Sequence, residues 1–204
     1  MFFVGMDVWS ESVEAVPVRL QHQLEFLLEI DRLKQVLRRS YLIGAERREN
    51  SAEHSWHLAV AAMVLAEYAR EEIDLSQVIR LVLVHDLVEI DAGDTFVYDD
   101  TGNATKAIKE MAAAERVFGL LPEEQRQDLM NLWLEFEARQ TPEAKFASAL
   151  DRLLPILHNA FNQGRSWKEH GIRREQALSK NRLIDDGAPA IWEAAQALIK
   201  QWLK

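Results

Sequence analysis

One aliphatic run carries a histidine next to an aspartate: Leu81-Val82-Leu83-Val84-His85-Asp86-Leu87-Val88-Glu89-Ile90-Asp91-Ala92-Gly93-Asp94. Burying an unpaired carboxylate costs several kcal/mol, so His85 and Asp86 need a partner inside such a segment. Neighbours on a helix lie about 100° apart, so both side chains can flank one point beside the axis, with Glu89 one turn away. The run therefore indicates either a metal site or a capping and salt-bridging pair at a helix end.

Two other apolar segments carry a residue of the same kind. Asn50 can cap a helix and Glu53 can close its capping box, which places His54 in the first turn of a nearly all-apolar helix. Asp151 lies inside the aliphatic run of residues 146–157. Three separated apolar helices, each with one inward ligand-type residue, predict a shared site.

The order of these residues resembles the HD superfamily of metal-dependent phosphohydrolases, and is most similar to the branch that includes the bacterial 5'-deoxynucleotidases. The resemblance covers about residues 33–160. It implies an all-α fold, a single HD-domain helical bundle with the metal site between helices. We expect one domain over residues 1–204, whose C-terminal helical extension from about residue 165 has no counterpart in the family members compared. The implied ligands of one divalent metal ion are His54, His85, Asp86 and Asp151.

Length and composition favour one soluble globular domain. The chain has 204 residues, of which 48% are hydrophobic and 28% charged. The net charge of −9 argues against a nucleic-acid polymer as partner. Without Cys, a metal must be held by His and carboxylates, and the chain fits a reducing cytoplasm. No signal peptide is visible and no run reaches the ~18–20 apolar residues of a membrane span.

Helical periodicity accounts for nearly the whole chain. Residues 1–16 read as an extension or short helix, and residues 38–44 as a loop. No alternating strand is evident, so we expect an all-α fold. The expected helices cover residues 19–38, 50–70, about 74–86, 104–118, 122–139, 141–157, 172–183 and 189–203, with a Gly- and Asp-rich loop over residues 91–103.

The expected chemistry is hydrolysis at phosphorus. A shell of two imidazoles and two carboxylates suits Mn, Co, Fe, Ni, Zn or Mg, which would act as a Lewis acid and lower the pKa of bound water. Glu89 is the nearest residue able to handle a proton of that water, and the alternative is a surface carboxylate that ends a helix. The resemblance assigns a catalytic role to Glu89 and to Asp94. It assigns no ligand role to His57, and we expect His57 and His158 to be packed or structural.

A basic segment upstream of His54 is the expected phosphate-binding region. The resemblance calls for an Arg followed closely by an aromatic residue, which matches Arg38 or Arg39 and then Tyr41. The family members compared carry Trp in place of Tyr41, and the alternative is a solvated basic turn. The sequence leaves the choice between Arg38 and Arg39 open.

The leading hypothesis is a phosphomonoesterase that acts on a small phosphorylated metabolite, with a (deoxy)nucleoside 5'-monophosphate as the first expectation. A sugar phosphate, an alarmone or a triphosphate is the alternative substrate. A metal-containing module that senses a nucleotide without turnover is the alternative class, although such a sensor would not need Glu89 and Asp94. The resemblance and the apolar residues of the terminal helices also predict a homodimer.

Overall fold

The computed structural model describes residues 16–203, without the side chains of residues 100–104. The extension expected at residues 1–16 lies outside this range except for its last residue. The helices and 3-10 turns are α1 (Val18–Ile30), η1 (Asp31–Gln35), α2 (Ser51–Leu65), η2 (Ala66–Tyr68), α3 (Leu75–Val84), η3 (His85–Val88), α4 (Glu89–Ala92), α5 (Asp100–Phe118), α6 (Glu123–Ala138), α7 (Pro142–Phe161), α8 (Arg165–Glu169), α9 (Arg174–Asn181), α10 (Ile184–Gly187) and α11 (Pro189–Trp202). This order confirms the all-α prediction.

A small hairpin stands where the sequence predicted a helix end and a loop. β1 (Leu37–Tyr41) pairs antiparallel with β2 (Arg48–Asn50). The first helix gives way to a 3-10 turn, after which Val36 is extended at φ −80° and ψ 111°. Along β1 the buried residues are Arg38 and Ser40, whereas Leu37 is exposed. Along this strand polar side chains point inward and an apolar one points outward, which is the reverse of the usual pattern. The hydropathy of the sequence therefore could not reveal the strand.

Helix starts follow the capping chemistry of the sequence. The Asn50 side chain accepts from Glu53 N, and Glu53 accepts from Asn50 N, which completes the predicted capping box of α2. Asp74 caps α3 through the backbone N–H groups of residues 76 and 77. Thr141 caps α7, with Pro142 at its first position. These caps hold α2, α3 and α7 at defined starts, and each carries or adjoins a predicted ligand.

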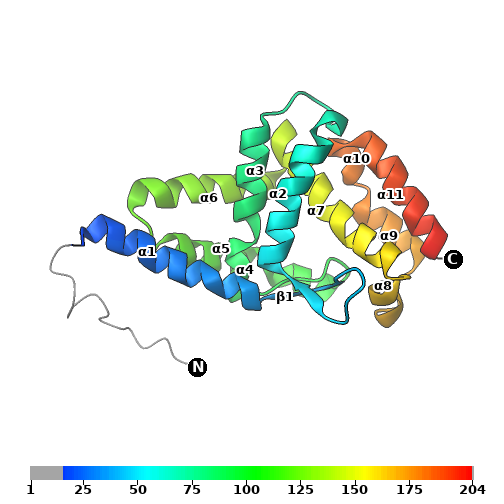
Figure 1. The fold of residues 1–204 in the computed structure, drawn as a ribbon, viewed down its shortest axis with the longest axis horizontal. Coiled ribbons are helices and arrows are strands. Elements are labelled where there is room, and N and C mark those ends of the chain that lie inside the picture. The colour runs from blue at the N-terminus through cyan, green and yellow to red at the C-terminus, as the bar shows by residue number, and fades with distance from the viewer. Residues whose placement is uncertain (1–15, 204) are drawn as a thin grey trace.

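Helix α7 is the centre of the molecule (Figure 1). It packs against α2, α3 and α6, and also against α10 and α11 of the C-terminal region. Gly187 allows the closest of these contacts, because a Cβ there would lie 2.3 Å from the carbonyl oxygen of Lys145. One hydrophobic cluster runs through these helices from Phe26 to Leu203. Throughout the described range, no helix combines the length and the apolar character needed to cross a membrane.

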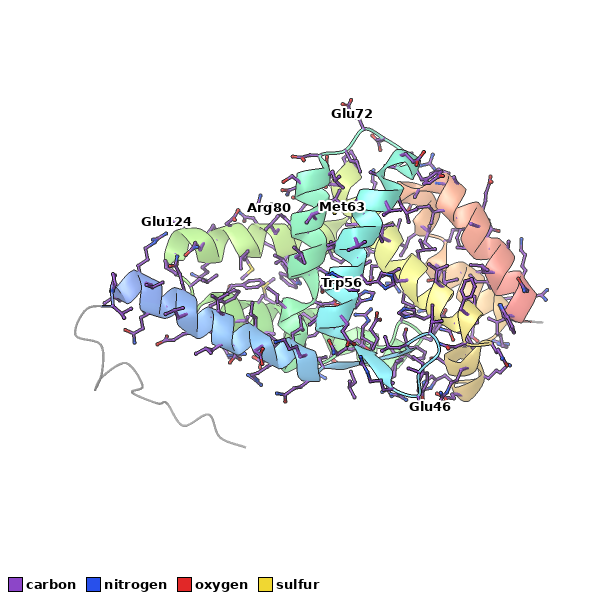
Figure 2. All side chains as sticks on the ribbon, in the orientation of Figure 1. Glu46, Trp56, Met63, Glu72, Arg80 and Glu124 are labelled. Carbon is purple, nitrogen blue, oxygen red and sulfur yellow. The ribbon has the colours of Figure 1, made fainter. Side chains whose placement is uncertain are left out.

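One face of α2 is apolar and exposed. Trp56 and Met63 project from this helix (Figure 2), and their exposed fractions are 65% and 62%. Val60 and Val64 lie on the same face, at helical spacing from Trp56, and are exposed as well. The opposite face buries His54, Leu58 and Ala62 in the core.

Candidate metal centre

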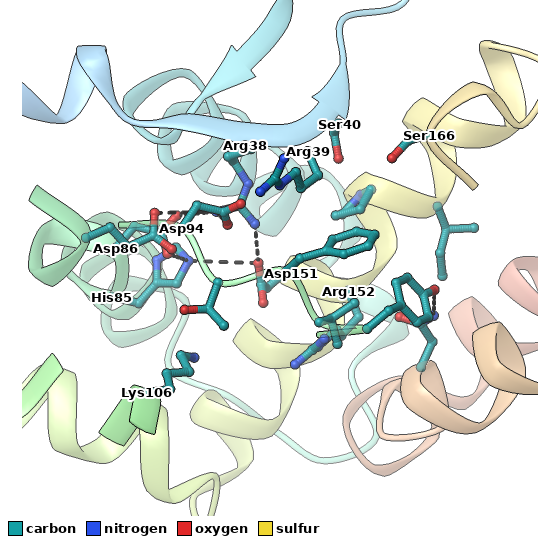
Figure 3. Close-up of a pocket in the computed structure, with 18 of the residues that line it drawn as sticks. Arg38, Arg39, Ser40, His85, Asp86, Asp94, Lys106, Asp151, Arg152 and Ser166 are labelled. Atoms are coloured by element: carbon teal, nitrogen blue, oxygen red, sulfur yellow. Dashed lines mark hydrogen bonds and ion pairs between the residues drawn. The ribbon is translucent and has the colours of Figure 1, made fainter. Parts of the chain in front are cut away.

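The four predicted ligands come together where α2, η3 and α7 meet, and His85, Asp86 and Asp151 line one pocket there (Figure 3). His54 Nε2 lies 2.9 Å from Asp151 Oδ1. His85 Nε2 lies 3.0 Å from Asp86 Oδ1 and 3.9 Å from Asp151 Oδ1. One ligand atom each of His54, His85 and Asp151 lies within 4.8 Å of the others. Residues far apart in sequence thus bring two imidazoles and the Asp151 carboxylate within reach of one ion, with the Asp86 carboxylate beside His85.

The local fold prepares His85 for coordination. Helix α3 ends at Val84, and His85 begins the 3-10 turn η3. His85 Nδ1 lies 2.9 Å from the carbonyl oxygen of Val82, and because a carbonyl only accepts, Nδ1 carries the hydrogen. His85 Nε2 is buried, points at the carboxylates and has no hydrogen-bond partner among the described residues. This is the arrangement of a metal-ligating histidine, whose second ring nitrogen is held by a backbone carbonyl.

Protonation of His85 opposes metal binding. Burial disfavours its charged form, yet the adjacent Asp86 carboxylate raises the pKa of His85 to about 9. A metal ion that binds at pH 7 must therefore displace a proton from Nε2. The same pairing lowers the pKa of Asp86 to about 2 against the effect of burial, so Asp86 is ionised.

The charge balance of the site also favours a cation. Arg38 Nη1 is 2.7 Å from Asp86 Oδ2 and 3.8–3.9 Å from carboxylate oxygens of Glu89 and Asp94, and Nη2 is 3.5 Å from Asp151 Oδ1. These four carboxyl groups outnumber the single guanidinium, and a bound cation would favour their ionised forms. The mixed nitrogen and oxygen donors suit a divalent transition ion or Mg²⁺. The residues present therefore fit a metal ion.

Glu89 and Asp94 are the two further carboxyl groups of the pocket, and their surroundings raise both pKa values. Glu89 is buried and accepts a 2.6 Å hydrogen bond from Ser51 Oγ. Burial, reinforced by the Asp86 charge, raises the pKa of Glu89 well above its ordinary value. Burial also raises the pKa of Asp94, with Arg38 opposing and Asp86 adding to the shift. Both carboxyls line the same pocket.

The structure distinguishes the two arginines of the basic segment. Arg38 points inward from β1 and is buried among the carboxylates, whereas Arg39 is exposed but still lines the pocket (Figure 3). Tyr41, expected to contact substrate, is not among the pocket-lining residues. Its hydroxyl lies 3.1 Å from Glu169 Oε2, and its ring lies 3.8 Å beneath the guanidinium of Arg165. Helix α8, which carries Arg165 and Glu169, thus engages Tyr41 outside the pocket.

The site also involves residues that the sequence motifs did not identify. The Ser51 hydroxyl donates to Glu89. Lys106 and Arg152 line the pocket and add positive charge to its wall (Figure 3). Arg152 had a visible signal, because a second charge directly follows Asp151 inside an aliphatic helix. Ser51 and Lys106 had none, since a Ser at a helix start and a Lys on an amphipathic helix are common. Asp91 pairs with Arg116 and Arg32, outside the pocket.

Comparison with protein families gives a match to the HD domain over residues 30–192. Among curated relatives, the human 5'-deoxynucleotidase HDDC2 is 34% identical over 135 residues, which cover 66% of this chain and 65% of the relative. The 5'-deoxynucleotidase hdd1 of Schizosaccharomyces pombe is 27% identical over 132 residues, or 62% and 65% of the two chains. The matched region thus spans just under two thirds of these relatives' length.

A crystal structure described as a predicted metal-dependent phosphohydrolase from Magnetospirillum magnetotacticum superposes with a TM-score of 0.85 at 48% identity. The superposition covers 90% of this chain and 92% of that one. The PH0347 protein of Pyrococcus horikoshii, 22% identical with a TM-score of 0.63, covers 86% and 99% of the two chains and shares the fold.

Proposed function

Because the chain belongs to the HD domain family, we propose that it is a metal-dependent phosphomonoesterase that releases phosphate from (deoxy)nucleoside 5'-monophosphates. The observation that carries the proposal is the convergence of His54, His85 and Asp151, with Asp86 beside His85, next to the Glu89 and Asp94 carboxyls, whose pKa values are raised. These are the parts that phosphate ester hydrolysis needs, namely a cation site, an acid–base pair and a positive wall.

His54, His85, Asp86 and Asp151 would hold a divalent ion, which would supply Lewis-acid polarisation of the phosphoryl group. Arg38 extends into the same space, so its guanidinium can bind a phosphate oxygen as a charge-assisted donor. Glu89, positioned by Ser51, takes the proton of the attacking water as the new P–O bond forms. Asp94 delivers a proton to the sugar oxygen as the old P–O bond breaks. Two carboxyls with separate surroundings can thus serve as base and acid.

The relatives named as 5'-deoxynucleotidases support a nucleoside monophosphate as substrate. The pocket supports a small anion as well, because Arg39, Lys106 and Arg152 line it beside Arg38. A chain with a net charge of −9 would repel a polyanion over most of its surface. A single phosphate avoids that repulsion, because it can bind to these four basic side chains and to the metal ion at the carboxylates.

The test is phosphate release from a panel of nucleoside 5'-monophosphates, sugar phosphates and triphosphates, with Mn²⁺, Co²⁺ and Mg²⁺ supplied in turn. We expect the deoxynucleoside 5'-monophosphates to give the highest kcat/KM. A preference for another member of the panel would support the proposed phosphohydrolase activity but show that the proposed substrate is wrong. Tight binding of one member without hydrolysis of any would overturn the proposal in favour of a sensor.

We also propose that the chain works as a cytoplasmic homodimer. The absence of Cys fits a reducing compartment. The apolar face of α2 offers a surface for a second copy, since Trp56, Val60, Met63 and Val64 are all exposed on it. The native ion is among Mn, Co, Fe, Ni, Zn and Mg, the set that the donor atoms allow.

A further inference from the structure

A second cluster of ligand-type side chains lies on the far side of His54. It consists of Glu49 from β2, His57 from α2 and His158 from α7. One ligand atom of each lies within 4.8 Å of the others. Glu49 Oε2 is 3.6 Å from His158 Nδ1, and the centroids of the two histidine rings are 5.8 Å apart.

The inner part of this cluster has unmet bonding capacity. Glu49 is 1% exposed and His158 is 4% exposed. Glu49 Oε2 and His158 Nδ1 are both buried and have no hydrogen-bond partner among the described residues. A buried carboxylate oxygen without a partner costs free energy that a native fold normally avoids. The cluster therefore calls for a partner that binds oxygen and imidazole nitrogen together.

The neighbouring side chains of Arg38 and His54 do not provide a hydrogen-bond partner for Glu49 Oε2. Arg38 Nε is 3.9 Å from Glu49 Oε2, beyond hydrogen-bond distance. His54 Nδ1 is 3.3 Å away, but Glu49 Oε2 and His54 Nδ1 both lack a partner with hydrogen-bond geometry. His158 is buried, which favours the neutral ring, and the buried Nδ1 atom faces Glu49 Oε2 at 3.6 Å.

We infer that Glu49, His57 and His158 form a second binding site for a divalent transition-metal ion. Two imidazoles and one carboxylate suit Zn²⁺, Co²⁺ or Ni²⁺ and leave positions for water. With metal–ligand bonds of about 2.1 Å, two ligands of one ion lie roughly 3–4 Å apart, which the Glu49–His158 separation matches. His57 is the half-buried member, so it supplies the side from which an ion enters.

The second site adjoins the first through one histidine. Glu49 Oε2 faces His54 Nδ1, while His54 Nε2 faces Asp151 in the first centre. The two sites share no ligand, since His54, His85, Asp86 and Asp151 make up the first. Each can therefore be removed without deleting a ligand of the other.

The experiment counts ions on the full chain. The protein is saturated with Co²⁺, passed through a desalting column and analysed for cobalt per chain. We expect two ions in the wild type, one in His57→Gln, one in His85→Ala and none in the double variant. His22→Gln is the matched control, because His22 is exposed and outside both clusters, and it should keep two ions. Circular dichroism checks that each variant retains its helices.

The outcomes separate this inference from the proposed function. One ion in the wild type that His57→Gln keeps and His85→Ala loses would overturn the second site and leave the first intact. If the wild type and His57→Gln both bound two ions, the additional ion would lie elsewhere, and the second site would also be overturned. Loss of one ion in His57→Gln, with no loss in His85→Ala, would support the second site and refute the first.

Discussion

Glu89 is the residue whose surroundings are most specific to catalysis. It is buried next to Asp86, receives the Ser51 hydroxyl and has a raised pKa. We expect Glu89→Gln to retain the metal ion and to lower kcat by about 10²–10⁴-fold, the usual contribution of a positioned acid–base group. The measurement pairs steady-state kinetics with elemental analysis. A fully active, metal-loaded Glu89→Gln would assign the proton transfer to another group, with Asp94 next.

Glu110 gives a prediction about stability and pH. Burial raises the pKa of Glu110 to about 7, with Lys106 opposing and Glu137 adding to the shift. An unfolded Glu releases its proton near pH ~4.3. Between these two values only the folded state keeps the proton, so the contribution of Glu110 to the free energy of unfolding falls as pH rises from ~4.3 to ~7. Above that range the contribution stays low.

Replacing Glu110 by the neutral Gln should remove this loss. We compare the free energy of unfolding of Glu110→Gln with that of the wild type. This difference should be more favourable to the variant at pH 8 than at pH 5, by an amount on the order of 3 kcal/mol at most. Urea unfolding at the two pH values measures it. Glu193→Gln, on the exposed face of α11, is the control and should change little at either pH. Equal effects of Glu110→Gln at both pH values would contradict the shifted pKa.

The clustering of the four predicted ligands could be anticipated, because charged groups are rare inside apolar helices and need a shared partner there. Glu49 and Ser51 escaped the same reasoning. They precede and begin α2, where polar residues are expected for capping, so nothing in the sequence separates them from ordinary cap residues. Their roles depend on His158 and Glu89, which approach only in three dimensions.

At the level of elements, the turn after α4 sets the path of the chain from Glu89 to Asp94. Gly93 has φ 75° and ψ 156°, a region open almost only to glycine. A Cβ at this position would meet nothing within 4 Å, so Gly93→Ala would suffer from backbone strain alone. We expect it to lower the free energy of unfolding by about 1–3 kcal/mol. It should also reduce kcat, because Asp94 directly follows the strained residue.

The matched control for this turn is Gly171→Ala. Gly171 has φ 60°, has open space around it and does not line the pocket. It should cost stability and leave kcat unchanged. If both variants lost stability with full activity, the turn would have no part in placing Asp94. Urea unfolding and phosphate release on the same samples decide between these results.

The β1–β2 hairpin is the part of the fold that the sequence pattern did not predict. Periodicity identified the long helices, whose apolar faces repeat with the helical period. In β1 the inward positions hold Arg38 and Ser40, because the strand faces a polar site instead of the core. A strand of that kind carries no apolar alternation, and only the tertiary structure explains its polar inward face.

For the whole molecule, the exposed apolar surface bears on assembly. The sequence suggested the terminal helices as the interface. Helix α1 does expose large apolar side chains, whereas α11, described in full, exposes none; those of α1 are Val18, Leu20, Leu27 and Leu28. The apolar face of α2 is a second candidate surface, and it is the one that a substitution of Met63 tests. We expect sedimentation at micromolar concentration to give about twice the 23.5 kDa chain mass. Met63→Asp should shift the protein to the monomer, whereas a wild-type monomer would contradict the dimer.

The proposed phosphate release by the whole molecule depends on a metal ion at the first centre. The most direct measurement is the rate of phosphate release from a deoxynucleoside 5'-monophosphate, followed against the metal content of the wild type and of Asp151→Asn. We expect the wild type to lose activity with a chelator and to regain it with Mn²⁺ or Co²⁺. Asp151→Asn, which weakens the bridge between His54 and His85, should stay inactive at the same metal supply. Undiminished hydrolysis by metal-free wild-type protein would contradict the account.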